Sequence, residues 1–161
     1  QDCGWAYETR SNIFVPDRKF SVNLRDALVD YGFQDILISD KNLKDEIYQV
    51  WCFDEKEKLD QTLKLIPENM KSYRWNDLSA EILPGEESKG NGIKKVLDYT
   101  AENSKVISFG DGVNDIEMFQ TSDIAVVMGN ANEDIKKYAD LITGDCDKDG
   151  IKEAFEKLGI R

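Results

Sequence analysis

The stretch Lys105-Val-Ile-Ser-Phe-Gly-Asp-Gly-Val-Asn-Asp115 indicates the fold class of this chain of 161 residues. Residues 106–109 are mostly apolar and predict a short buried strand. Two glycines then allow a tight turn in which the backbone can approach a ligand closely. A helix that begins near Val113 would bring Asp111 and Asp115 to the C-terminal edge of a parallel sheet, where open α/β folds bind their ligands.

The two carboxylates of this stretch predict a magnesium site. Asp111 and Asp115 offer hard oxygen ligands, and Mg²⁺ is usually bound by one or two carboxylates together with waters and substrate phosphate oxygens. Asn114 lies beside the second acid. The simpler interpretation is an Asp-rich helix start, since Asp is common at N-caps. It explains one acid, but not two acids and an asparagine next to two glycines, so we favour the metal site.

The composition is that of a globular chain with an excess of acidic residues. It is 40% hydrophobic and 33% charged, and its formal net charge is −11. This balance argues against nucleic acid or an anionic membrane as a partner. The chain has no histidine, which excludes Ser-His-Asp and Cys-His catalysis from its own residues. Cys3, Cys52 and Cys146 follow no disulfide or metal spacing, which predicts a reducing, cytoplasmic setting.

The pattern of the chain changes at Pro84-Gly85. Residues 1–84 mix helices with what we expect to be an antiparallel sheet. Residues 85–161 alternate helix and strand, which predicts βα units on a parallel sheet and an α/β fold. In the first part we expect strands within 5–15 and at 47–53, 70–75 and 79–83, and helices at 20–31 and 55–66. In the second part we expect strands at 105–109, 124–128 and 140–143, and helices at 88–101, 113–121, 132–139 and 149–158.

Aromatic residues are frequent in the first part of the chain and have two interpretations. They could line a substrate pocket, or they could pack in the interior, as aromatic residues at such spacings commonly do. The residues concerned are Trp5, Tyr7, Trp51, Tyr73 and Trp75.

The first helix after the boundary has an unfavourable start. Ser88 suits the N-cap, but Lys89 places a cation at the positive end of the helix dipole. Gly90 and Gly92 each cost up to about 1 kcal/mol relative to alanine in a helix interior. Such departures concentrate at functional sites. A lysine beside free N–H groups would form a phosphate cradle, and the alternative is a solvated lysine on a surface helix.

Three segments of the second part stand in a fixed order: residues 88–93 (Ser-Lys-Gly-Asn-Gly-Ile), 110–119 (Gly-Asp-Gly-Val-Asn-Asp-Ile-Glu-Met-Phe) and 127–131 (Val-Met-Gly-Asn-Ala). Together they resemble the motifs of the haloacid dehalogenase (HAD) superfamily. The match is best to its Cof-type phosphatases, and it extends over residues 85–161. The resemblance implies a Rossmann-like core in that range. It also implies that residues 1–84 are part of an α/β cap that closes over the site and selects the substrate, a small phosphorylated metabolite.

The resemblance also implies roles for four residues. Lys89 corresponds to the lysine that neutralises the transferred phosphoryl group and the nucleophile. Asp111 corresponds to the acid that binds Mg²⁺. Asp115 corresponds to the second acid, which supports the metal directly or through water. Asn114 corresponds to the polar neighbour that contacts the phosphate or a metal-bound water.

The family's nucleophile is the first Asp of an Asp-x-Asp pair near the N-terminus, and it forms an aspartyl-phosphate. Asp54 follows a predicted strand, but Lys56 stands where the second acid should be. Asp145 and Asp147 have the spacing but follow the last predicted strand. We therefore expect the C-terminal part of a phosphatase, inactive alone. Because the missing strand would leave a sheet edge open, we expect a complementary N-terminal fragment or a homodimer to cover it.

Asp145-x-Asp147-x-Asp149-Gly150-x₅-Glu156 also satisfies the EF-hand pattern and would predict a calcium site. A strand precedes it rather than a helix, and Lys152 stands where an apolar residue is usual. In the simpler interpretation Asp149 caps the final helix. Two alternatives to the phosphatase therefore remain, a non-catalytic metal-binding or regulatory module and a calcium-binding protein.

Overall fold

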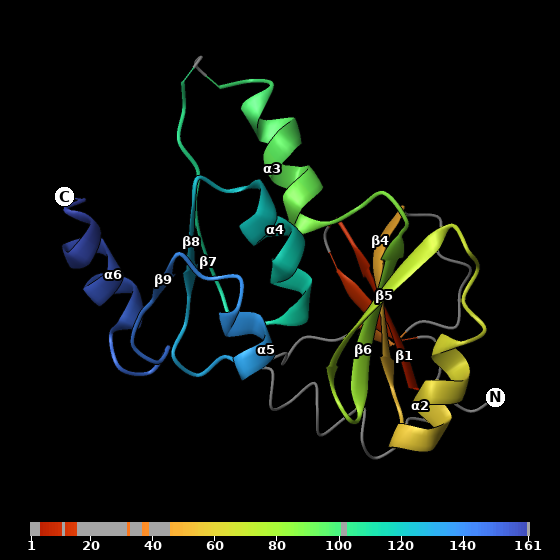
Figure 1. The fold of residues 1–161 in the computed structure, drawn as a ribbon. Coiled ribbons are helices and arrows are strands. Elements are labelled where there is room, and N and C mark those ends of the chain that lie inside the picture. Colours follow the sequence, from red (N-terminus) through yellow and green to blue (C-terminus); the bar gives the residue numbers. More distant parts are fainter. Residues whose placement is uncertain are drawn as a thin grey trace. The chain divides into compact units, whose positions relative to one another are not determined.

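The computed structural model describes residues 4–10, 12–15, 32, 37–38, 46–100 and 103–160. The chain divides into two compact units, Gln1–Glu86 and Glu87–Arg161 (Figure 1). This division lies two residues after the boundary expected at Pro84-Gly85. The assignment of the units as cap and core remains a prediction.

The first unit contains a six-stranded sheet in the order β3-β2-β1-β4-β6-β5. All neighbouring strands are antiparallel except β2 and β3, which are parallel. The predicted strands and the hairpin through Asn76-Asp77 are confirmed, whereas the helix expected at 20–31 lies outside the described residues. The strands are β1 (Gly4–Thr9), β2 (Ile13–Val15), β3 (Leu37–Ile38), β4 (Ile47–Phe53), β5 (Met70–Asn76) and β6 (Ser79–Pro84).

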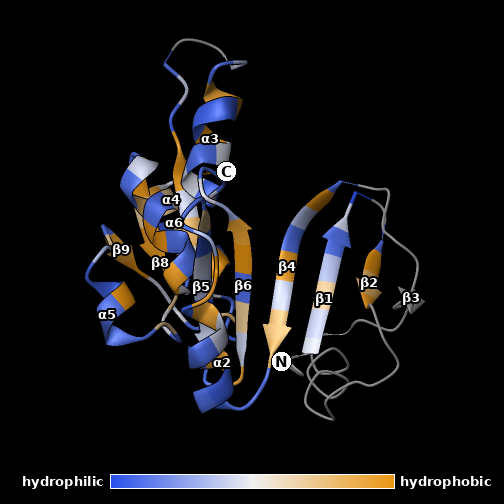
Figure 2. Ribbon diagram, turned by 90° about the vertical axis from the view of Figure 1, so that its right-hand side faces the viewer, coloured by the Kyte–Doolittle hydropathy of each residue, from blue (hydrophilic) through white to orange (hydrophobic). Residues whose placement is uncertain are grey.

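Helix α2 (Lys56–Leu63) covers one face of this sheet. Its buried Leu59 packs with Cys52 and Ala80, and in Figure 2 the rest of the helix is largely hydrophilic. The helix is shorter than the predicted range 55–66. Its end tightens into a turn in which the Leu65 N–H donates to the Thr62 carbonyl oxygen, a spacing of three residues that commonly ends an α-helix.

The opposite face of the sheet carries the aromatic core of the first unit. Trp51 is only 6% exposed and is buried with Ala6, Val15 and Phe53. The rings of Trp51 and Trp75 meet edge to face, with their centroids 5.9 Å apart, an arrangement that aromatic pairs favour. For these two tryptophans, therefore, the packing interpretation holds.

The second unit is an α/β structure with a parallel sheet in the order β7-β8-β9. This confirms the predicted fold class and the alternation of helix and strand, although most helices are shorter than expected. The strands are β7 (Ile107–Gly110), β8 (Ile124–Val127) and β9 (Leu141–Ile142). The helices are α3 (Lys89–Leu97), the 3-10 helix η1 (Val113–Asp115), α4 (Ile116–Thr121), α5 (Glu133–Lys136) and α6 (Gly150–Leu158). None of the helices in the described residues is long and apolar enough to cross a membrane.

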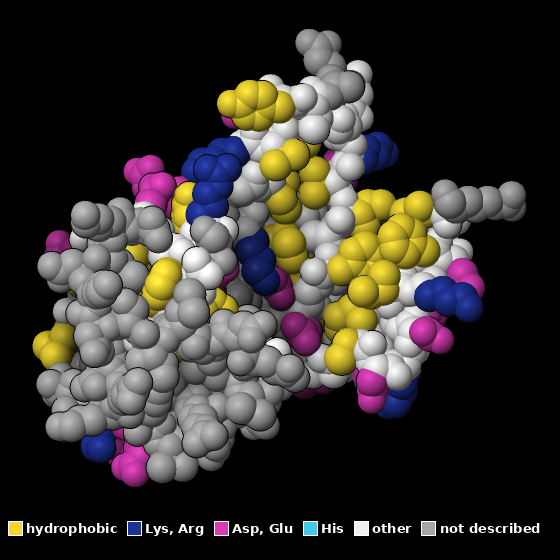
Figure 3. Space-filling model, turned by 180° about the vertical axis from the view of Figure 1, so that it is seen from behind, with side chains coloured by type: hydrophobic (Ala, Val, Ile, Leu, Met, Phe, Trp, Pro, Cys, Tyr) yellow, Lys and Arg dark blue, Asp and Glu magenta, His cyan; other side chains and the backbone are white. Residues whose placement is uncertain are grey.

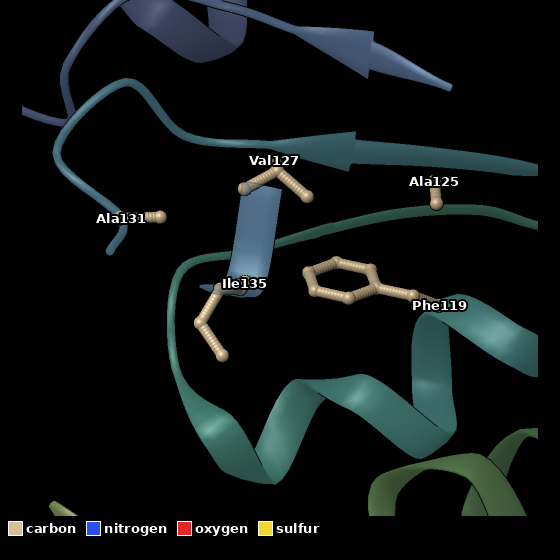
Figure 4. Packing of buried hydrophobic residues seen from close by; sticks show 5 residues of the cluster. All are labelled: Phe119, Ala125, Val127, Ala131 and Ile135. Carbon is tan, nitrogen blue, oxygen red and sulfur yellow. The ribbon is translucent and has the colours of Figure 1, made fainter. Parts of the chain in front are cut away.

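The core of the second unit forms around the central strand β8. Residues 125–128 are all buried, as expected for a parallel strand covered on both faces. Figure 4 shows the side chains that α4 and α5 contribute to one side of this strand. The cluster consists of Phe119, Ala125, Val127, Ala131 and Ile135.

Helices α3 and α4 lie unusually close together at Gly90. A Cβ atom added at Gly90 would lie 2.5 Å from the carbonyl oxygen of Glu117, whereas one added at Gly92 would meet nothing within 4 Å. The glycine at position 90 is thus explained by packing. Gly90 is needed for the approach of the two helices, whereas the phosphate site expected at this helix start remains a prediction.

Replacing Gly90 with alanine should lower the stability of the second unit by about 1–3 kcal/mol, because overpacking forces shifts of that cost. Gly92→Ala is the matched control, and it should raise stability by up to about 1 kcal/mol through the higher helix propensity of alanine. Thermal unfolding followed by circular dichroism measures both effects. Equal melting temperatures for the two variants would contradict the close packing of α3 on α4.

Candidate active site

The buried carboxylate of Asp115 closes the turn that follows β7. One carboxylate oxygen, Oδ2, accepts hydrogen bonds from the backbone N–H groups of Asp111 and Gly112, at 2.9 and 3.0 Å. Asp115 is only 3% exposed. A side chain at Gly110 would overlap this carboxylate, so glycine is required where β7 ends. The sequence pattern of glycines and acids therefore encodes one compact turn.

Lys89 binds the other oxygen of the same carboxylate. Its Nζ donates to Asp115 Oδ1 at 2.5 Å, and the lysine side chain remains 51% exposed while that of Asp115 is 5% exposed. The helix start that carries Lys89 is capped by Ser88, whose Oγ accepts from the Asn91 N–H at 3.1 Å. Two residues predicted for the site, far apart in the sequence, are thus in direct contact.

Asp111 lies at the exposed end of the turn and has a different partner. Its Oδ2 accepts a hydrogen bond from Asn130 Nδ2 at 2.7 Å. Asp111 follows β7 and Asn130 follows β8, and because these parallel strands are neighbours, both residues come to the same edge of the sheet. Asn130 was not predicted as a site residue. It lay in the segment 127–131 that carries the family resemblance, but nothing in the sequence indicated its contact.

The two aspartates differ in their capacity to hold a metal ion. Within the described residues, Asp111 Oδ1 accepts no hydrogen bond, whereas both lone pairs of Asp115 Oδ2 are occupied by backbone N–H groups. Asp115 can therefore reach a cation only through Oδ1, which it shares with Lys89. Asn114, the remaining predicted residue, is half-buried in the 3-10 turn between them.

The described part of the chain contains no group of three or more acidic, thiol or imidazole side chains in position to hold a metal ion. A site with two carboxylates still fits Mg²⁺, which is commonly bound by one or two protein carboxylates plus water and phosphate.

The stretch from Asp145 to Glu156 does not form a calcium loop. Asp145 of the pattern pairs with Lys148 instead. Glu153, which is not among the ligands of the pattern, accepts the Gly144 N–H at 2.9 Å. The side chain of Glu153 also pairs with Lys157, and the hydrogen bond from this lysine lowers the pKa of Glu153. Asp149 stands at the N-cap of α6 with a left-handed φ of 54°, but its side chain makes no capping hydrogen bond. The structure therefore supports neither the calcium site nor side-chain capping by Asp149.

Comparison with known proteins relates this arrangement to one family. The sequence profile of the haloacid dehalogenase-like hydrolases matches residues 1–155. YkrA of Bacillus subtilis is 39% identical over 118 residues, which are 71% of this chain and 44% of YkrA. A phosphoglycolate phosphatase of Sulfurisphaera tokodaii is 30% identical in an alignment of 166 positions that covers 96% of this chain and 68% of that protein.

The fold comparison agrees with the sequence comparison. The solved structure of the HAD subclass IIB sugar phosphatase BT4131 is similar with a TM-score of 0.77 at 29% identity, and the match covers 99% of this chain and 62% of the other. This chain therefore spans less than half of YkrA and less than two thirds of the sugar phosphatase.

Asp115→Asn should destabilise the second unit by about 1–3 kcal/mol, the usual cost of leaving buried hydrogen-bonding groups without partners. An asparagine side chain can turn its oxygen toward the backbone N–H groups or toward Lys89, and its NH₂ group then faces the other donors. Asp111→Asn is the control, and because Asp111 is exposed it should change stability by less than about 0.5 kcal/mol. Denaturant titrations without divalent cations measure both. If the two variants lost equal stability, Asp115 would not be the anchor of the turn.

Proposed function

The chain belongs to the haloacid dehalogenase-like hydrolase family, and from this membership we propose that it carries the Mg²⁺- and phosphate-binding part of a phosphomonoester hydrolase active site. The observation that carries the proposal is the contact of Lys89 with Asp115, in the turn that also presents Asp111. The phosphatases among its relatives support the same activity.

Asp111 is the residue we assign to the metal. Its exposed carboxylate has one oxygen held by Asn130 and one oxygen without a hydrogen bond in the described residues. Mg²⁺, when bound, would neutralise negative charge on the phosphoryl oxygens of the substrate. Asp115 holds the turn that presents Asp111, and it contributes to the metal through Oδ1 or through a water molecule.

Lys89 is the residue we assign to the phosphoryl group. An ammonium group has three N–H donors, and Asp115 takes one of them. With half of its side chain exposed, Lys89 keeps donors for the phosphate oxygens, and these charge-assisted hydrogen bonds are strong. The buried carboxylate fixes the position of the ammonium. Asn114 is assigned to the phosphate or to a metal-bound water.

The nucleophile requires a further strand, which we propose pairs with the free edge of β7. Among the described strands, β7 pairs only with β8. On α6, Phe155 stacks on Phe109 of β7 with ring centroids 5.4 Å apart and remains 39% exposed. Figure 3 shows hydrophobic side chains gathered on this side of the second unit. A strand with Asp-x-Asp at its end would cover this surface and place the nucleophile beside Asp111, and a second copy of the chain is the alternative cover.

The internal Asp145-x-Asp147 pair is a poor nucleophile by comparison. It follows β9, which is separated from β7 by β8, and Asp145 is already paired with Lys148. A carboxylate held by a lysine on its own loop is not presented to a phosphoryl group at Asp111.

We propose a small phosphorylated metabolite as the substrate, selected by the first unit acting as a cap. Two of the relatives named above act on phosphoglycolate or on sugar phosphates according to their names, and both are small phosphorylated compounds. The net charge of −11 argues against nucleic acid and anionic membranes as partners. Within the described residues, Cys52 and the exposed Cys146 form no disulfide, which favours a cytoplasmic location.

A peptide-complementation assay tests the proposal. Residues 1–161 with Mg²⁺ should not hydrolyse p-nitrophenyl phosphate, whereas adding a strand-forming peptide that ends in Asp-x-Asp should restore turnover. The peptide with Asn in place of the first Asp is the control and should be inactive, and Asp111→Asn should abolish the restored activity.

Turnover by residues 1–161 alone that Asp145→Asn removes would show an internal nucleophile and overturn the proposal. Mg²⁺ binding that depends on Asp111, without turnover under any of these conditions, would instead establish the non-catalytic metal-binding module.

A further inference from the structure

The side chain of Asn130 joins the candidate metal ligand to a loop that has no other role in the site. Its Nδ2 donates to Asp111 Oδ2 at 2.7 Å, and its Oδ1 accepts from the backbone N–H of Cys146 at 2.9 Å. Cys146 lies between β9 and α6, within the stretch 145–156 for which the sequence pattern had suggested a calcium site. The two ends of one amide thus contact two separate segments.

The contact with Cys146 determines which end of the amide faces Asp111. A backbone N–H can only donate, so it requires the amide oxygen. The NH₂ group must then point to the carboxylate of Asp111, and it donates a hydrogen bond to the carboxylate oxygen. Without the Cys146 contact, the side chain of Asn130 would be free to turn.

The loop that supplies this N–H is itself firmly attached. The Gly129 N–H donates to the Gly144 carbonyl oxygen at 3.1 Å, and the Gly144 N–H donates to Glu153 of α6 at 2.9 Å. The buried Thr143 hydroxyl donates to the Gly150 carbonyl oxygen at 2.6 Å. Hydrogen bonds therefore connect α6, through the loop and Asn130, to the carboxylate of Asp111.

We propose that Asn130 is a positioning residue for the metal-binding carboxylate, and that the loop 143–149 orients it. By holding Oδ2 of Asp111, it fixes the carboxylate so that Oδ1 stays available to the cation. Hydrogen-bond partners of this kind, one layer outside the metal ligands, commonly change metal affinity by about 10–100-fold when they are removed. The inference rests on the proposed function, since it requires Asp111 to be a metal ligand.

Metal titrations of residues 1–161 test the inference without a substrate. Mn²⁺ binding is followed by electron paramagnetic resonance, and Mg²⁺ competes for the same site. Asn130→Ala should weaken Mn²⁺ binding roughly tenfold, while the melting temperature without metal stays equal to that of the control Asn132→Ala. Asn132 is an exposed asparagine two residues further along, and its side chain makes no capping hydrogen bond.

Two further variants separate the possible outcomes. Cys146→Ala should bind Mn²⁺ as the parent chain does, because the contact uses the backbone N–H and not the thiol. Asp111→Asn should abolish binding. If Asp111→Asn removes binding but Asn130→Ala behaves like Asn132→Ala, the positioning role of Asn130 is overturned and the proposed function stands. If no Mn²⁺ binding depends on Asp111, the proposed metal site is wrong, and the inference is overturned with it.

Discussion

The buried carboxylate of Asp115 is the interaction on which the candidate site depends. A charge removed from water is costly unless it is paired and hydrogen-bonded, and Asp115 is only 3% exposed. Its partners are two backbone N–H groups of its own turn and the ammonium of Lys89. All of these contacts are made only when the turn, the end of β7 and helix α3 are in place. A chain that folds this unit correctly has also brought Lys89 to the turn that carries Asp111.

The same interaction explains why an unfavourable helix start persists. A cation in the first turn of a helix is disfavoured by about 0.3–1 kcal/mol at an exposed position, and Lys89 occupies such a place. The ion pair with a buried carboxylate offsets this cost. Gly90 contributes by allowing α3 to approach α4, which brings Lys89 within reach of Asp115. The residues at this helix start are unfavourable for helix formation, but the tertiary contacts require them, as is common at functional sites.

The sequence was sufficient for most of the strands, because they depend on local patterns, although the short strand β3 was not predicted. Strand β4 has the predicted bounds, Ile47–Phe53, and the turn after β7 follows from its glycines and acids. Helix ends were less accurate, since α2 has apolar residues beyond the point where its backbone tightens at Thr62. The contact of Asn130 with Asp111 could not be predicted, because it depends on the side-by-side placement of β7 and β8. The EF-hand pattern failed for the opposite reason, since its acids have the spacing, but Asp145 is paired with Lys148 and the described residues bring no three acids together to hold a metal ion.

The position of β8 between two partner strands implies that stability is distributed unevenly over the second unit. Its residues 125–127 are buried, and its backbone is hydrogen-bonded on both sides. Amide hydrogens there should exchange with solvent only when the whole unit opens, whereas those on the outer edge of β7 should exchange through local fraying. A strand added at the edge of β7 would slow amide hydrogen exchange in β7 and leave the exchange rates in β8 almost unchanged. The exchange rates of β7 relative to those of β8 would therefore show whether a further strand has paired with the sheet.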